Sequence, residues 1–271
     1  IDTLSVTASD NAPASAPNHA PILATDSLVL ESLQAWQQTA SQPLPPQAQV
    51  GDELQVTWVW RARQDVDSDQ QARLVWRDDT GRIQGATPPL PLTRSYPTSQ
   101  WQSGDHWQGW HRVYVPGDLQ AGTYQVGVAL GDQVGTVTTM QVTTPQRTFD
   151  APTIATPVTQ AWQNGIHLLG YARDDASLIL HWRTDAQLNR SLRLFVHLLD
   201  DNGNIVAVRD GVPVRWSRPT TGWAVGEYIR TAHDFDGLTV ADYRWRIGWY
   251  DPRTGQRVLL EDDSDSLLID P

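Results

Sequence analysis

Residues 96–105 read YPTSQWQSGD, and residues 218–227 read RPTTGWAVGE. Both stretches follow the order Pro-Thr-Ser/Thr-x-Trp-x-x-Gly-acid, and they are 122 positions apart. A pattern that returns at a fixed spacing indicates an internal repeat, which decides how the whole chain folds. The stretch is therefore either a binding loop used twice or a piece of scaffold built twice.

The same offset aligns other parts of the chain, in the same order. Residues 56–61 (VTWVWR) align with residues 178–183 (LILHWR), and His111 aligns with His233. Ordered matches that share one offset predict a tandem repeat, whose first copy has diverged further than its second.

We predict two domains, residues 34–146 and residues 147–271, after a leader or linker over residues 1–33. The boundary between them is expected near Thr143–Thr156, a stretch that contains two prolines. Ala8–Pro21 is rich in Ala, Ser and Pro, which is the composition of a tether.

Each copy is predicted to be all-β. Val56, Trp58 and Trp60 alternate with their neighbours at period two, as half-buried strands do. Residues 192–199 (LRLFVHLL) are nearly all apolar and predict a central strand. Turn signals every 8–12 residues favour two tandem β-sandwich domains, either immunoglobulin-like or jelly-roll-like. Ser27–Gln38 is the one helical candidate.

Composition excludes several classes of function. The formal net charge of −11 disfavours nucleic acid and anionic membrane surfaces as partners. The chain has no cysteine, so it has no disulfide and no thiolate metal site. No run reaches the roughly 18 apolar residues that a membrane span needs. The chain starts at Ile1 without a methionine, which predicts a piece of a longer protein.

The second copy resembles a known family over residues 166–269. The matching residues include the run 195–200 (FVHLLD), then Asp210 and Pro213. They continue with the repeated motif and with residues 248–255 (GWYDPRTG). This pattern resembles the extracytoplasmic C-terminal β-sandwich module of bacterial multi-pass, mannosyltransferase-like membrane glycosyltransferases. The first copy departs from it, because it has Leu-Gly-Asp at 130–132 where the second has the Tyr-Asp hairpin.

The resemblance implies an extracytoplasmic, non-catalytic accessory module, tethered to the membrane through a missing N-terminal portion. Its expected partners are the membrane-embedded domain of the parent chain and a glycan or lipid-linked sugar, with no cofactor and no catalytic residue. One alternative is a structural or protein-interaction module of a cell-surface protein. A weaker alternative is an uncharacterised glycan hydrolase.

Most of the thirteen tryptophans are predicted to be buried. Three pairs occur at the same position in both copies, which favours a shared core role: Trp36 and Trp162, Trp60 and Trp182, Trp101 and Trp223. Five others align with apolar residues in the other copy, so burial is the simpler account: Trp58, Trp76, Trp107, Trp245 and Trp249.

Trp110 and Trp216 are the two candidates for glycan binding, because they align with Ala232 and Arg94. By strand alternation, Trp110 shares a polar face with His106, Arg112 and Tyr114. Trp216 is expected in a loop beside Arg215 and Arg218. The alternative is that both tryptophans pack in an interdomain contact or another interface.

The repeated motif itself is predicted to be a structural corner. The prolines fix the backbone, the threonine hydroxyls bond nearby amides, the tryptophans plug the sandwich, and the glycines permit a sharp turn. The residues are Pro97, Thr98, Trp101 and Gly104 in the first copy, and Pro219, Thr220, Trp223 and Gly226 in the second.

Metal binding and catalysis are not expected in this chain. Asp65, Asp67 and Asp69 resemble the start of a calcium loop, which lacks the glycine and glutamate that an EF-hand needs. The seven histidines lack metal-ligand spacing, although His181 and His197 are candidates for neighbours on adjacent strands. No nucleophile elbow, phosphate-binding loop or HExxH motif is present.

Overall fold

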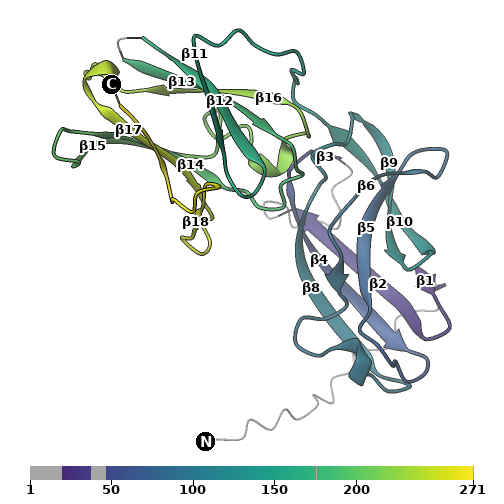
Figure 1. Cartoon of the computed structure of the whole chain (residues 1–271). Coiled ribbons are helices and arrows are strands. Elements are labelled where there is room, and N and C mark those ends of the chain that lie inside the picture. The colour runs from purple at the N-terminus through teal and green to yellow at the C-terminus, as the bar shows by residue number, and fades with distance from the viewer. Residues whose placement is uncertain (1–19, 38–46, 175, 271) are drawn as a thin grey trace, which may run out of the picture.

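A computed structural model describes residues 20–37, 47–174 and 176–270 of the chain. The described residues between 20 and 143 form two sheets around one core, which we call the first sandwich (Figure 1). One sheet has the order β1-β2-β4-β8; the other has the order β3-β10-β9-β5-β6, with β7 beside β5. The strands are β1 (Leu23–Ala24), β2 (Leu28–Gln37), β3 (Gln47–Gln49), β4 (Glu53–Ala62), β5 (Gln71–Arg77), β6 (Ile83–Ala86), β7 (Leu90–Pro91), β8 (His106–Tyr114), β9 (Gly122–Leu130) and β10 (Gln133–Thr143).

Residues 156–270 form a second pair of sheets with a core of their own, the second sandwich. Its sheets have the orders β11-β12-β13-β16 and β15-β14-β17-β18, with β19 beside β17. The strands are β11 (Thr156–Ala161), β12 (Ile166–Arg173), β13 (Ser177–Thr184), β14 (Arg193–Leu199), β15 (Ile205–Gly211), β16 (Tyr228–Asp234), β17 (Arg244–Tyr250), β18 (Arg257–Val258) and β19 (Leu267–Ile269). The described helices are three short 3-10 turns at Thr98–Gln100, Thr220–Gly222 and Val240–Asp242.

The all-β sandwich fold predicted from the sequence is confirmed. Strands β4 and β13 bury alternate side chains, and β14 lies between β15 and β17 as a central strand. Nine of the tryptophans expected in the core are at most 1% exposed, and Trp107 is half-buried. The side chain of Trp36 lies outside the described part. The nine are Trp58, Trp60, Trp76, Trp101, Trp162, Trp182, Trp223, Trp245 and Trp249.

The prediction for the start of the chain was wrong in two respects. Ser27–Gln38 was the helical candidate, yet Leu28–Gln37 forms strand β2. Residues 1–33 were expected to be a leader, yet β1 and most of β2 belong to the first sheet, with Leu28 and Leu30 buried in its core. Residues 8–19 of the predicted linker lie outside the described residues.

The repeated motif makes the same hydrogen bonds in both sandwiches. The hydroxyl of Thr98 accepts from the amide of Gln70 at 2.6 Å, and the hydroxyl of Thr220 accepts from the amide of Leu192 at 3.0 Å. Each threonine therefore ties the corner to a loop 28 residues earlier. This differs from the expected bond within the motif's own turn, because the backbone of the earlier loop lies within hydrogen-bonding distance of the threonine hydroxyl.

The glycine and tryptophan of the motif also have matching surroundings. The amide of Gly104 donates to Ala62 at 2.9 Å, and that of Gly226 donates to Thr184 at 2.7 Å. Both glycines have positive φ, +94° and +80°, which is strained for other residues. Beside them, Trp101 and Trp223 are buried, each in the core of its own sandwich.

In the second sandwich the corner has an additional role, because it docks onto the first sandwich. The buried hydroxyl of Thr221 donates to the carbonyl of Gly51 at 2.9 Å. The amide of Val225 donates to Asp118 Oδ1 at 2.8 Å. A Cβ atom on Gly51 would lie 2.5 Å from the amide nitrogen of Gly222, so the two backbones are in direct contact. We call this contact the joint; it lies near β3 in Figure 1.

Candidate functional site

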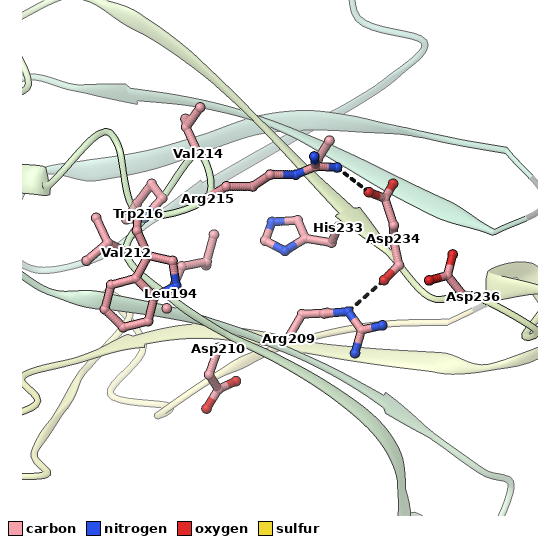
Figure 2. Close-up of a pocket in the computed structure, with 13 residues that line it drawn as sticks. Leu194, Arg209, Asp210, Val212, Val214, Arg215, Trp216, His233, Asp234 and Asp236 are labelled. Carbon is pink, nitrogen blue, oxygen red and sulfur yellow. Dashed lines mark hydrogen bonds and ion pairs between the residues drawn. The ribbon is translucent and has the colours of Figure 1, made fainter.

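A cleft of about 370 Å³ opens between β15 and β16, the edge strands of the two sheets of the second sandwich. Its walls are Arg209–Gly211 on one side and Ala232–Asp234 on the other, and residues 212–216 close one end. Figure 2 shows Trp216 at one end of the view, His233 in the middle and Asp236 at the other end.

Trp216 belongs to a loop with an unusual backbone. Val214, Arg215 and Trp216 have φ values of +54°, +49° and +71°, and none of them is glycine. A β-branched residue such as Val214 rarely adopts this left-handed conformation, and such conformations cluster at functional sites. The Trp216 side chain contacts Gly211, and the guanidinium of Arg193 lies 4.7 Å from its ring centroid. Trp216 remains 66% exposed, so much of its ring faces solvent.

Asp234 ties the cleft wall to the loop. Its carboxylate accepts from Arg215 at 2.7 Å and from Ser177 at 2.8 Å, and its backbone carbonyl accepts from Arg209 at 2.6 Å. The hydrogen bonds from Ser177 and Arg215 lower the pKa of Asp234, which keeps the carboxylate charged. Figure 2 shows both arginines reaching Asp234 from different sides.

His233 contributes an uncharged ring to the cleft. Burial, helped by the charge of Arg209 and opposed by that of Asp234, lowers the pKa of His233 to about 4. Its Nε2 lies 3.0 Å from the hydroxyl of Thr231. At neutral pH this side chain is therefore a polar but neutral group.

The structure places the predicted residues around Trp216 in two different surroundings. Trp216 and Arg215 both line the cleft. Arg218 does not, because it forms an ion pair of 2.6 Å with Glu227, which is fully buried. Arg218 therefore supports the corner beside the joint.

The predicted residues around Trp110 lie together on one face of β8 in the first sandwich, where Trp110 is 42% exposed. Arg94 and Arg112 both lie over its ring, 5.6 and 5.8 Å from the centroid. Arg112 is 2.8 Å from Glu53. Glu53 also accepts from Tyr114 at 3.3 Å, and His106 lies 3.5 Å from Glu31. Both rings have an arginine over them, but Trp110 is 42% exposed and Trp216 is 66% exposed, so the Trp110 ring is the less available of the two.

The two candidate tryptophans occupy different positions of the repeat. Trp110 pairs with Thr57 between β4 and β8, and Ala232 pairs with Ile179 between β13 and β16, in the same register at the offset of 122. Arg94, which covers Trp110, takes the position that Trp216 takes in the second sandwich. Where the first sandwich has a large ring, the second has the small side chain of Ala232 in the cleft wall.

Three further residue differences explain why the loop stands away from the second sandwich. In the first, the indole of Trp58 donates to the carbonyl of Leu92 at 2.7 Å, and Leu92 is fully buried. Gly109 makes this possible, because a Cβ atom there would overlap the carbonyl oxygen of Leu92. The loop therefore packs down onto the sheet.

The corresponding residues of the second sandwich are Leu180, Val214 and Thr231. Leu180 has no donor, Thr231 adds a side chain where Gly109 has none, and Val214 is 37% exposed. The loop cannot pack down in the same way, and the cleft opens beneath it.

Sequence reasoning missed several residues of the cleft, notably Arg209, Gly211, Ala232 and Asp234. The signal that pointed here was the difference between the copies, which singled out Trp216 and Trp110. When the same comparison includes small residues as well as large ones, it also identifies Ala232, which takes the position of Trp110 in the second copy.

Among the described residues, no group of three or more His, Cys, Asp or Glu side chains is arranged to hold a metal ion. The acidic run at 65–69 instead supports the first corner: Asp65 accepts from the amide of Ser103 at 2.9 Å, and Asp69 from that of Ser99 at 3.1 Å. The expected neighbours His181 and His197 lie in different sheets, on β13 and β14, so that prediction was wrong.

No helix in the described ranges is long and apolar enough to cross a membrane. No family model matches the sequence. No curated protein matches it either.

Among solved structures, the chain is similar to the C-terminal domain of wzt, with 12% identity over 47% of this chain and 84% of that one, at a TM-score of 0.30. It is also similar to a DUF4785 family protein from Legionella pneumophila subsp. pneumophila str. Philadelphia 1, with 15% identity over 82% of this chain and 53% of that one, at a TM-score of 0.22. The chain's own strands and sheets identify it as an all-β sandwich protein.

Proposed function

We propose that the chain is a non-catalytic carbohydrate-recognition module whose ligand binds in the cleft of the second sandwich. The observation that carries the proposal is the comparison of the two sandwiches. In the same part of each sandwich, the first has a loop that packs down and Trp110 at 42% exposure, whereas the second has an open cleft with Trp216 at 66% exposure.

The chemistry of the cleft suits a sugar. An exposed indole offers a flat apolar face, on which the C–H groups of a sugar ring can stack. Charged side chains that are already oriented, such as Arg215 and Asp234, can exchange hydrogen bonds with hydroxyl groups. The cleft volume of about 370 Å³ falls within the range of small-molecule sites.

The family resemblance supports an extracytoplasmic setting beside a membrane glycosyltransferase, where the ligand would be a glycan or a lipid-linked sugar. Two residues of the resembling pattern, Asp210 and Pro213, line the cleft. A third, His197, lies 3.1 Å from the Asp210 carboxylate. This context predicts that the natural protein also carries several apolar membrane spans.

The recognition role is tested by glycan-array screening of the purified chain, followed by calorimetry with any hit. Trp216→Ala removes the platform, and Ala232→Trp fills the cleft with the side chain that the first sandwich has at the corresponding position. We expect either change to weaken binding at least tenfold. Trp110→Ala is the matched control and should leave binding unchanged.

Two results would contradict the proposal. One is that the chain, shown to be folded, binds none of the bacterial glycans on the array. The other is binding that survives both cleft variants and disappears in Trp110→Ala, which would place the ligand on the first sandwich.

A second candidate, a protein-interaction module, is favoured by one observation. Strand β15 is an edge strand, and its Ile205, Val206 and Val208 are 50%, 43% and 43% exposed. Exposed apolar edge strands can pair with another chain. Sedimentation would reveal such pairing if the wild type has a molecular mass above that of one chain and Val206→Lys lowers this mass.

A further inference from the structure

We infer that the cleft selects uncharged sugar rings with adjacent hydroxyl groups, and that it rejects glycans whose rings carry carboxylate or phosphate groups. This inference rests on the proposed function, and it adds the chemical class of the ligand.

The basic groups of the cleft are already engaged. Arg215 is bound to the carboxylate of Asp234, and Arg209 donates to the carbonyls of Asp234 and Val208, at 2.6 and 2.9 Å. Arg193 lies over the ring of Trp216 rather than in the cleft wall. A ligand anion is bound best by a guanidinium that can offer it two parallel N–H groups. Here an anion would have to compete with Asp234 for Arg215.

Acidic groups outnumber the basic groups along the cleft wall. Asp210, Asp234 and Asp236 line it, against Arg209 and Arg215, and His233 is neutral at pH 7 because burial lowers its pKa to about 4. In the described part of the chain, Asp236 has no ion pair. The chain as a whole has a formal charge of −11, which adds to the repulsion of a negative ligand.

Neutral hydroxyl groups are not repelled by the carboxylates, and they do not have to displace Asp234 from Arg215. A guanidinium has five N–H donors, so Arg215 keeps several after binding Asp234. The Asp236 carboxylate is acceptor-only and can accept from a hydroxyl group at the far end of the cleft from Trp216 (Figure 2). A ring beside the Arg215–Asp234 pair can accept from Arg215 and donate to Asp234, and two adjacent hydroxyls satisfy both requirements.

The test uses matched oligosaccharides that differ only at C6. Calorimetry compares trisaccharides of glucose, galactose and mannose with the corresponding trisaccharides of glucuronic, galacturonic and mannuronic acid. We expect at least one neutral sugar to bind, with its uronate partner at least tenfold weaker. Asp236→Asn should narrow that ratio, whereas Asp79→Asn, which makes the same change in net charge on an exposed hairpin of the first sandwich, should not.

The outcomes separate this inference from the proposed function. A uronate that binds as tightly as its neutral partner, and that is lost in Trp216→Ala, overturns the inference and supports the cleft as a glycan site. A preference for neutral sugars that persists unchanged in Asp236→Asn overturns the electrostatic account. If neither class binds to the folded chain, the proposed function fails, and this inference fails with it.

Discussion

Replacing Gly222 with glutamine should open the joint without disturbing the fold of the second sandwich. The first sandwich has Gln100 at the corresponding position, in the same kind of 3-10 turn, so the turn itself accepts this side chain. At the joint, however, a Cβ atom on Gly222 would lie 2.7 Å from the carbonyl oxygen of Val50. This oxygen belongs to the backbone, so it cannot move aside by a side-chain rotation.

The cost follows from the contacts that must separate. Moving the sandwiches apart breaks the bond from Thr221 to Gly51 and that from Val225 to Asp118. Separation costs about 1 kcal/mol for each bond, and staying together costs about 1–3 kcal/mol for the overpacked side chain, so we expect the joint to weaken by roughly 1–3 kcal/mol.

Two measurements check this prediction. Small-angle X-ray scattering should show a larger radius of gyration for Gly222→Gln, and calorimetry should show the second sandwich melting at a lower temperature. The control is Gln100→Gly, which makes the reverse change at an exposed corner and should cost at most about 1 kcal/mol. An unchanged radius together with unchanged melting would refute a joint based on backbone contact.

Three further predictions concern the corners and a buried histidine. Trp101→Ala and Trp223→Ala should each destabilise the chain by roughly 3–5 kcal/mol, as truncation of a buried aromatic residue does, so a near-native melting temperature would argue against the corner role. Asp65→Ala should cost about 1 kcal/mol in urea unfolding, because it leaves the amide of Ser103 without its acceptor. Burial, with a smaller effect of the nearby Arg94 charge, lowers the pKa of His111 to about 4, below the value of about 6.5 expected in the unfolded chain. The unfolded chain therefore binds a proton first, and His111 should reduce the free energy of unfolding by up to about 3 kcal/mol as the pH falls from 6.5 to 4. His111→Gln should flatten this slope, and an equal slope in both proteins would show that His111 is not responsible.

The fold could be predicted from the sequence wherever strands alternate regularly. Strand β4 does so over its whole length, and the prediction there was right. Strand β2 has a bulge between Leu30 and Ser32, after which the core-facing side chains change from even-numbered to odd-numbered positions, such as Leu33 and Ala35. A shift of this kind gives the apolar residues the irregular spacing of a helix, which is why Ser27–Gln38 was misread.

The cleft could be predicted only in part, because it forms between edge strands of different sheets. Trp216 and Arg215 could be identified from the sequence, since they differ from the other copy. The contributions of Gly211 and Asp234 depend on how β15 and β16 face each other, and a pattern along one strand does not contain that information. The joint was hidden for the same reason, because it depends on a contact between two glycines 171 positions apart.

The exchange of glycine for glutamine between the two corners gives the chain a direction. The corner with Gly222 can seat a neighbouring sandwich against its backbone, whereas Gln100 keeps any neighbour at side-chain distance from the first corner. A longer array built from this unit could not grow past the first corner by the same contact. Glycine at position 222 thus allows two sandwiches to join by backbone contact, and glutamine at position 100 prevents the same contact at the first corner.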